Sequence, residues 1–273
     1  MEKQIVLLTG ASAGIGKATA ELLIKEGVIV YGASRSGGEA YKNEQSGGEF
    51  IPVKMDVNNE ADLKSTVEKI ISDHGCLSAV IANAGFGIAG SVEDTNIEEA
   101  KSQFETNFFG VMKTVHACLP IFRAQGYGKI ITVSSLAGII PIPFQTLYSS
   151  VKAAVIMFMY GLSMEVKPFG IQCSTILPGD TKTDFTKNRK YTSASDNEKS
   201  VYYKTMKRSV AKMEKDEQNG MLSYAVAKPI VKQVLNKRVK KIYVTGIFNQ
   251  IFYHLFNALP NNFRLFVIGK LYA

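Results

Sequence analysis

The chain has 273 residues, of which 46% are apolar and 21% charged, a balance that fits one α/β domain over residues 1–273 and leaves little room for a second. The net charge of +8 comes without a nucleic-acid-binding motif, so we expect no nucleic-acid partner. A solvated basic surface and attraction to anionic cofactors or lipid head groups both remain open. The three cysteines and three histidines are scattered, which argues against a disulfide framework and predicts no metal site.

Short β-branched runs alternate with longer amphipathic segments along the chain. The runs predict buried strands over Ile5–Leu8, Val28–Tyr31, Ile51–Met55, Ala79–Ala82, Ile130–Val133, Gln172–Ile176 and Ile242–Val244. The amphipathic segments predict helices over Gly16–Lys25, Glu60–His74, Ile97–Phe122 and Ser149–Lys167. The alternation predicts a Rossmann-like, doubly wound α/β fold, with a seven-stranded parallel sheet and helices on both faces.

Two regions depart from this alternation. Residues 180–220 are long, polar and lysine-rich, and they follow the sixth strand where a ligand crevice should open, so we expect a substrate lid. Residues 245–273 form an apolar C-terminal extension that Asn, Gln and Pro interrupt, which argues against a membrane span. Packing over the active site, dimerisation and lying on a membrane surface remain open for it. Because the N-terminus starts on a strand-like run without a signal peptide, we expect a cytoplasmic protein, either free or membrane-associated.

A glycine-rich turn lies between the first expected strand and the first helix. It contains Gly10, Ser12, Gly14, Ile15 and Gly16. Glycines at these positions let backbone N–H groups approach a pyrophosphate, and the helix N-terminus adds positive partial charge. The strand–turn–helix context therefore predicts a dinucleotide site.

The spacing Thr-Gly-xxx-Gly-x-Gly resembles that of compact short-chain dehydrogenases/reductases. At the end of the second strand, residues 31–36 carry no carboxylate to bond the ribose hydroxyls of NAD. Arg35 would instead pair with the 2′-phosphate of NADP, and Ser34 could donate a hydrogen bond to it. We therefore expect NADP (as NADPH) rather than NAD, although Ala13 stands where family members often carry a further basic residue.

Two more elements support the resemblance. It implies that Asp56, after the third strand, bonds the adenine amino group and that Val57 lies beside the ring. An alternative for Asp56 is capping of the next helix. Asn83, Ala84 and Gly85 follow the fourth strand and are similar to the family's Asn-Ala-Gly element, where the cofactor lies against the strand end.

The catalytic candidates are Ser135, Tyr148 and Lys152. Tyr148 and Lys152 are four residues apart on one helix face, and Ser135 lies 13 residues before the tyrosine, the interval usual in this family. A free phenol has a pKa of roughly 10, and a nearby ammonium lowers it. Tyr148 is therefore the predicted general acid in reduction and base in oxidation, with Lys152 lowering its pKa. The resemblance implies that Lys152 also bonds the nicotinamide ribose. Ser135, rather than Ser134, is predicted to hold the substrate oxygen.

By resemblance, Asn107 would position a water that relays protons from Lys152, although a purely structural role for it is also open. The resemblance also implies that four residues after the sixth strand contact the nicotinamide or the phosphates. These are Pro178, Gly179, Thr181 and Thr183.

The expected pocket walls are mainly apolar and favour a hydrophobic carbonyl or secondary alcohol. They comprise Phe86, Leu136, Ile139, Ile140, Pro141, Ile142 and Phe144. The C-terminal tail is similar to those of members that act on long-chain keto lipids, steroids or retinoids, and an acyl-carrier-linked substrate is also open. The predicted function is hydride transfer between NADPH and such a carbonyl or secondary alcohol. The resemblance implies a homodimer or homotetramer paired through helices near residues 100–124 and 149–167, although the apolar faces of these helices could equally be internal core. A non-catalytic NADP-binding regulator and an isomerase or epimerase are the alternatives.

Overall fold

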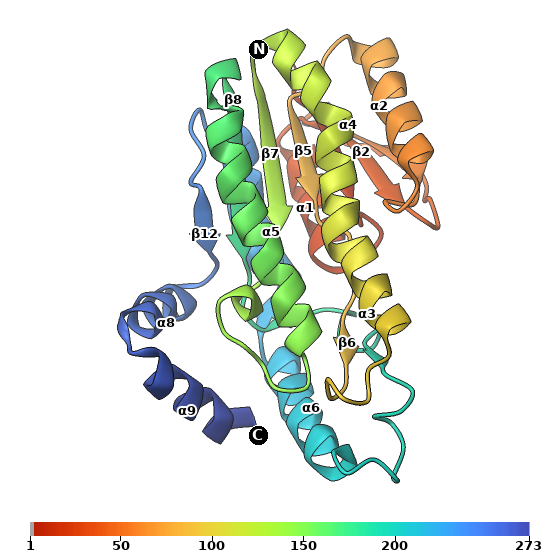
Figure 1. Ribbon diagram of the computed structural model, residues 1–273. Helices are drawn as coiled ribbons and strands as arrows, with labels where there is room; N and C mark the ends of the chain where they lie inside the picture. Colours follow the sequence, from red (N-terminus) through yellow and green to blue (C-terminus); the bar gives the residue numbers. More distant parts are fainter. Residues whose placement is uncertain (1–2, 273) are drawn as a thin grey trace.

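A computed structural model describes residues 3–272 and shows a central sheet covered by helices on both faces (Figure 1). The sheet has eight strands in the order β12-β8-β7-β5-β1-β2-β4-β3. Seven of them pair in parallel, at the positions that the sequence predicts, and this confirms the doubly wound fold. They are β1 (Ile5–Thr9), β2 (Ile29–Ser34), β4 (Glu49–Lys54), β5 (Ala79–Ala82), β7 (Gly128–Val133), β8 (Ile171–Leu177) and β12 (Ile242–Val244).

The eighth strand corrects the predicted count. β3 (Tyr41–Lys42) pairs antiparallel with β4 at the edge of the sheet. It has two exposed residues, too few to produce a periodic apolar pattern in the sequence.

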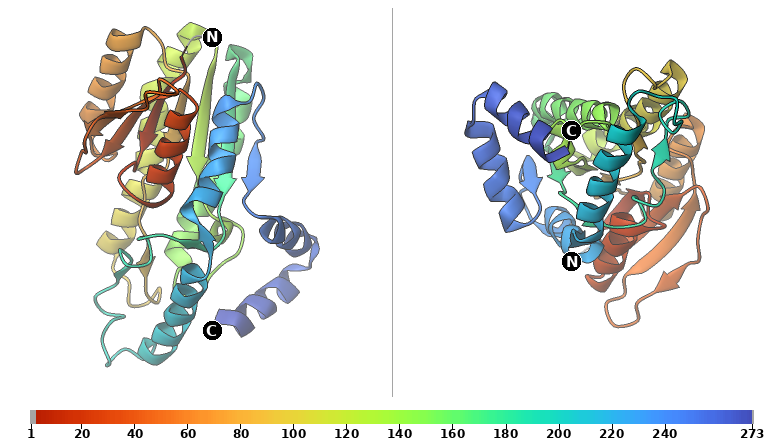
Figure 2. Two further views of the ribbon diagram at one scale, coloured as in Figure 1. Left: turned by 180° about the vertical axis from the view of Figure 1, so that it is seen from behind. Right: turned by 90° about the horizontal axis from the view of Figure 1, so that it is seen from below.

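Alternate residues of each strand point to opposite faces, so the two faces have separate cores. Ile5 and Leu7 of β1 belong to the core beneath α2, α4 and α5, whereas Val6 and Leu8 belong to the core beneath α1 and α7. Figure 2 shows the second pair of helices on the face hidden in Figure 1. The helices on the two faces are α1 (Gly14–Lys25), α2 (Glu60–His74), α4 (Gly110–Gln125), α5 (Thr146–Glu165) and α7 (Ser223–Leu235).

Local signals set the helix ends. Asn59 caps α2 by accepting a hydrogen bond from the Ala61 N–H, and Gly75 ends the helix in the left-handed conformation with φ +72°. α3 (Ile97–Phe104) starts with a capping box between Asn96 and Glu99. The predicted helix 97–122 is not continuous: a π-helical segment, Glu105–Phe109, separates α3 from α4.

The predicted lid region contains one helix and short strands. β9 (Thr181–Lys182) pairs with β11 (Met221–Leu222), and β10 (Lys190–Tyr191) pairs with β6 (Ile88–Ala89). α6 (Tyr203–Gln218) runs below the carboxyl ends of the sheet strands in Figure 1. The pairing of β10 with β6 ties the region to the segment that follows β5.

The C-terminal extension forms α8 (Ile247–Ala258) and α9 (Asn261–Tyr272), which project from the β12 edge and return toward α6 (Figures 1 and 2). Two 3-10 turns, Leu136–Gly138 and Lys167–Phe169, flank α5. Within residues 3–272, α5 is the one helix long and apolar enough to cross a membrane, and half of that apolar stretch is buried in the protein. Its Val155, Met159 and Leu162 belong to the core against the sheet.

Candidate active site

The turn between β1 and α1 is shaped to receive a pyrophosphate. Gly10 and Gly14 have φ values of +68° and +54°, which disfavour other residues. A Cβ on Gly16 would lie 2.0 Å from the Gly10 carbonyl oxygen, so α1 can approach the strand only with glycine there. Ala13, the N-cap, offers no side-chain acceptor to the first turn of α1. The free N–H groups of that turn therefore suit an anionic group.

Thr9 and Asn83 hold this turn against the end of β5. The Thr9 hydroxyl oxygen accepts hydrogen bonds from the N–H groups of Asn83 (3.0 Å) and Ala84 (3.1 Å). Asn83 Nδ2 donates to the carbonyl oxygens of Thr9 and Gly10, both at 3.1 Å. Asn83 and Ala84 thus lie beside the glycine turn as predicted. Thr9 is an additional residue of the site, and its signal was a polar residue at the end of an otherwise apolar strand.

The predicted adenine side is open. Ser34 ends β2 and donates to the Gly37 carbonyl oxygen at 2.9 Å, while Arg35 and Ser12 are exposed. Because Asn59 caps α2, Asp56 is not that cap. One Asp56 oxygen accepts from the Asn58 N–H at 3.0 Å.

Val57 and Ile15 are the two apolar residues predicted on the cofactor side. Val57 is buried, and a Cβ on Gly110 would lie 2.9 Å from its Cγ2 atom, so α4 contacts it closely. Ile15 is half-buried at the start of α1 and packs against the core on that face of the sheet.

The two serines at the end of β7 have different partners. Ser134 is buried and its hydroxyl donates to the Lys152 carbonyl oxygen at 2.8 Å, which ties β7 to α5. Ser135 Oγ accepts from the Ala137 N–H at 3.1 Å, and its side chain lowers the pKa of the Tyr148 phenol. Of the two serines, Ser135 is therefore the one that acts on the phenol.

Tyr148 and Lys152 lie one turn apart on α5, as their spacing predicts. The buried Lys152 Nζ donates to the Val133 carbonyl oxygen at 3.1 Å and lies 5.6 Å from the centroid of the Tyr148 ring. Burial lowers the pKa of Lys152 to about 8. Burial also raises the pKa of Tyr148, and the hydrogen bond with Ser135 opposes that rise. The lowered tyrosine pKa expected from sequence is thus absent here, because desolvation of the phenol outweighs its neighbours.

Asn107 lies in the π-helical segment and holds the chain after β5. Its Oδ1 accepts from the Phe86 N–H at 3.0 Å, and its Nδ2 donates to the Phe86 carbonyl oxygen at 2.7 Å. A Cβ on Gly85 would approach Asn107 Oδ1 to 3.0 Å, which explains a glycine there. This geometry gives Asn107 a positioning role, and the water relay stays a prediction.

The four residues after β8 separate into two groups. Thr183 reaches the phosphate turn, since a Cβ on Gly14 would lie 3.4 Å from its side chain. Thr181 turns away and donates to the Gly179 carbonyl oxygen at 2.8 Å. Pro178 accepts from the Leu136 N–H at 2.8 Å, which fixes the turn beside the serine pair.

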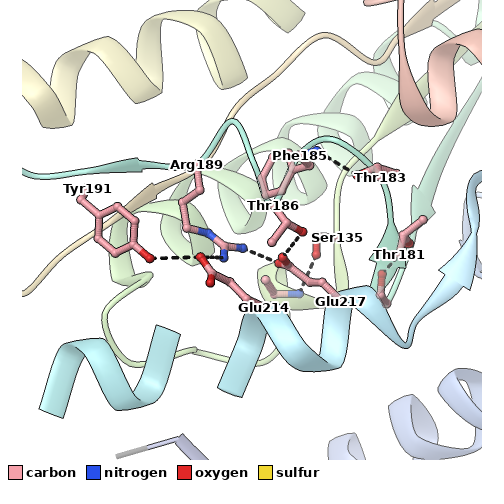
Figure 3. A network of polar contacts seen from close by, with 11 residues as sticks. Ser135, Thr181, Thr183, Phe185, Thr186, Arg189, Tyr191, Glu214 and Glu217 are labelled. Carbon is pink, nitrogen blue, oxygen red and sulfur yellow. Dashed lines mark hydrogen bonds and ion pairs between the residues drawn. The ribbon is translucent and has the colours of Figure 1, made fainter. Parts of the chain in front are cut away.

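A polar network in the lid, drawn in Figure 3, lies next to this centre. Arg189 is buried and forms ion pairs with Glu217 and with Glu214 (3.6 Å) of α6. Thr186 donates to Glu217 at 2.6 Å, and Tyr191 donates to Glu214 at 3.0 Å. Glu217 raises the pKa of the Tyr148 phenol electrostatically, and Arg189 lowers it. The network therefore fixes the lid within electrostatic range of the predicted acid.

Phe185 and Arg189 were missed by sequence reasoning. The Phe185 ring is tilted by 54° against the Tyr148 ring with the centroids 5.5 Å apart, and a Cβ on Gly87 would lie 2.8 Å from the same phenyl ring. Arg189 had one usable signal, since it is the single arginine among the lysines of residues 180–205. Arginine is favoured over lysine for buried, bidentate ion pairs.

The predicted apolar wall divides between two clusters. Leu136 and Ile140 pack with Phe256 of α8 and Ile268 of α9. Ile142 and Phe144 pack against α6. The C-terminal helices therefore support the loop that follows Ser135. Among residues 3–272 no group of three His, Cys, Asp or Glu side chains is arranged to hold a metal ion.

Comparison with known proteins finds short-chain dehydrogenases and reductases. A family model described as short chain dehydrogenase matches residues 4–194. A 3-ketodihydrosphingosine reductase of Bacteroides thetaiotaomicron is 37% identical over 274 residues, covering 100% of this chain and 99% of that protein. A protein of Helicobacter pylori described as a probable short-chain type dehydrogenase/reductase is 32% identical, covering 97% of this chain and 98% of that one.

Solved structures share the fold. A short-chain dehydrogenase from Burkholderia cenocepacia in complex with NADP has a TM-score of 0.73 at 20% identity, covering 100% of this chain and 99% of that chain. A short-chain dehydrogenase/reductase from Burkholderia phymatum in complex with NAD has a TM-score of 0.78 at 20% identity, covering 94% and 93%. At these identities the structural likeness concerns the fold alone.

Proposed function

Because the chain belongs to the short-chain dehydrogenase family, we propose that it is an NADPH-dependent reductase of a hydrophobic, long-chain ketone. The observation that carries the proposal is the contact set of Ser135, Tyr148 and Lys152 at the carboxyl ends of the sheet strands, beside the glycine turn. The family and its oxidoreductase activity are the premise; the choice of cofactor and substrate is our proposal.

The residues of the site divide the work of reduction. Bound nicotinamide supplies the hydride, so the chain must supply a proton to the ketone oxygen. Burial keeps the Tyr148 phenol protonated at neutral pH, ready to donate. Ser135, hydrogen-bonded to the same phenol, holds the ketone oxygen and stabilises its developing charge. The ammonium of Lys152, one turn away, favours the phenolate that remains.

Support for NADPH comes from the end of β2. Arg35 is exposed there, next to Ser34, and no carboxylate lies among residues 31–36 to repel a 2′-phosphate. Gly10, Gly14 and Gly16 would receive the pyrophosphate, with Thr183 above it. On the adenine side we assign Asp56 and Val57, and on the nicotinamide side Pro178 and Gly179.

Support for a long-chain ketone comes from the apolar clusters around Ser135 and from the 3-ketodihydrosphingosine reductase that is 37% identical over the whole chain. The lid of residues 180–220 would close over such a chain, with Phe185 leaving the tyrosine ring when substrate enters. This movement is part of the proposal.

A homodimer or homotetramer through α4 and α5 is a further part of the proposal. Large apolar side chains are exposed on α4 (Met112 at 38%), on α5 (Met157 at 69% and Met164 at 65%) and on the π-helical segment just before α4 (Phe109 at 40%). Exposed apolar patches on helices of this length are typical of interfaces.

The test is NADPH oxidation with ketones of increasing chain length, with NADH as the parallel cofactor. We expect activity to rise with chain length and to favour NADPH at least tenfold. Arg35→Glu should reverse the preference, whereas Arg123→Glu, an exposed arginine on α4, should not. Equal rates with both cofactors, or activity confined to short polar ketones, would contradict the assignment.

A companion variant separates catalysis from binding. Tyr148→Phe should abolish turnover while NADPH binding persists, and Tyr160→Phe on the same helix should be active. NADPH binding without any ketone reduction by the unaltered protein would favour the non-catalytic NADP-binding regulator.

A further inference from the structure

The last two helices present apolar side chains to solvent. On α8, Ile247, Phe248, Ile251 and Leu255 are 69%, 84%, 52% and 62% exposed. Their spacing of one, three and four residues places them on one helix face. Phe263, Leu265 and Phe266 of α9 are also 51%, 55% and 61% exposed.

The amphipathic pattern of α8 is inverted. In a helix that packs on a water-soluble core, the polar residues face outward. Here two polar side chains face inward: Asn249 Nδ2 donates to the Thr245 carbonyl oxygen at 2.8 Å, and Gln250 Nε2 donates to the Val244 carbonyl oxygen at 2.9 Å. His254 and Asn257 are exposed as well, but most of the exposed side chains of the helix are apolar, so this face requires an apolar environment supplied from outside the subunit.

The charge of the same region is one-sided. All 24 acidic residues lie at or before Glu217, where they balance the 24 lysines and arginines of residues 1–217. Residues 218–273 contain eight basic residues and no acidic one, so the whole net charge of +8 resides there. The eight are Lys228, Lys232, Lys237, Arg238, Lys240, Lys241, Arg264 and Lys270. Such charge is complementary to an anionic surface.

These cations lie before α8 in the chain or on α9. Lys237, Arg238, Lys240 and Lys241 are exposed just before the edge strand β12, whose other end leads into α8. On α9, Lys270 Nζ lies 5.9 Å from the centroid of the exposed Phe266 ring. The combination of exposed aromatic residues, cations and absent acids is that of an interfacial amphipathic segment.

We propose that α8 and α9 dock in the plane of an anionic lipid bilayer. Each helix has 12 residues and is therefore about 18 Å long, too short to span the hydrocarbon core. Phe256 and Ile268 anchor the pair through the cluster that contains Leu136 and Ile140, directly after Ser135. Docking therefore brings the apolar wall of the site to the bilayer surface. The binding itself does not depend on the proposed reductase activity.

The experiment is flotation of the full chain with vesicles of phosphatidylcholine alone or mixed equally with phosphatidylglycerol. We expect at least tenfold stronger binding to the anionic vesicles. Phe248→Ser/Leu255→Ser/Phe266→Ser should abolish binding, while Ile97→Ser, at a 68% exposed apolar residue elsewhere, should not. Lys237→Gln/Lys240→Gln/Lys241→Gln should weaken binding to anionic vesicles at least fivefold, and the same changes at the exposed Lys42, Lys64 and Lys101 should not.

Two results would overturn the proposal. One is absence of flotation with anionic vesicles. The other is that the unaltered protein forms an oligomer, measured by light scattering, and does not float, while the apolar triple variant is monomeric. The apolar face would then be an interface between copies of the chain. NADPH oxidation with a short, soluble ketone is measured on every variant. Because all substitutions lie outside the catalytic centre, a failure of docking leaves that activity intact and is distinguishable from failure of the reductase assignment.

Discussion

Lys152→Met should make the protein inactive but more stable. Lowering the pKa of the buried ammonium from 10.5 to about 8 corresponds to about 3 kcal/mol that the charged side chain costs the native state. Loss of the hydrogen bond to the Val133 carbonyl oxygen offsets about 1–2 kcal/mol of the gain. The net gain of about 1–2 kcal/mol should raise the Tm by about 2–6 °C at pH 7.

The gain should depend on pH. Because the native pKa of Lys152 is below the unfolded value, the unfolded chain binds more protons between about pH 8 and 10.5. The cost in the unaltered protein is thus complete below pH 8 and disappears as the pH rises to about 10.5. Urea unfolding of both proteins, without cofactor, at pH 7 and pH 10 measures the difference.

Lys113→Met serves as the matched control. Lys113 is paired with Glu105 at 2.5 Å and with the Asn58 carbonyl oxygen at 2.9 Å, so its removal should destabilise the protein. The reasoning is refuted if Lys152→Met is less stable than the unaltered protein at pH 7, or if its advantage is the same at both pH values.

Three further variants probe separate parts of the site. Gly16→Ala should weaken NADPH binding at least tenfold, measured by cofactor fluorescence, because a Cβ there collides with the Gly10 carbonyl oxygen. An unchanged affinity would contradict binding of the pyrophosphate at the glycine turn. Ser135→Ala should lower kcat at least 100-fold and lower Tm only through loss of the bond from the Ala137 N–H, whereas Ser134→Ala should cost about 1–2 kcal/mol of stability because the buried hydrogen bond to the Lys152 carbonyl oxygen is lost. Equal effects of the two variants on kcat would remove the distinction. Arg189→Leu should destabilise the lid by about 3–5 kcal/mol, because Glu217 loses its ion-pair partner. Limited proteolysis should then cut the lid sooner than in the unaltered protein. The double variant Arg189→Leu/Glu217→Leu should be partly resistant again.

The parallel strands and the catalytic spacing were predictable because both depend on local pattern. Buried strands such as β1 carry continuous apolar runs, and Tyr148 and Lys152 share a face simply by being one turn apart. The two serines at the end of β7 differ in their partners, and the role of Ser135 in holding the substrate oxygen stays a prediction.

What the sequence could not supply involves contacts between distant segments. The Asn107 amide binds a backbone 21 residues away, and Phe185 reaches the tyrosine ring from the lid. The apolar content of residues 247–258 was visible in the sequence, but the outward orientation of that face depends on the inward hydrogen bonds of Asn249 and Gln250. The pKa of Tyr148 depends on burial, which no spacing rule reports.

The π-helical segment changes the helical phase between α3 and α4, which follow one another along the chain. The Gly110 N–H donates to the Glu105 carbonyl oxygen, five residues back, so one residue more than an α-helical turn is accommodated. An extra residue rotates everything after it by about 100° relative to an uninterrupted helix. The apolar stripes of α3 and α4 are thereby free to follow different phases, and Asn107 stays aimed at the backbone of Phe86. Deleting one residue from the π-helical segment would restore a regular α-helix, and the Asn107 side chain would no longer point at the backbone of Phe86.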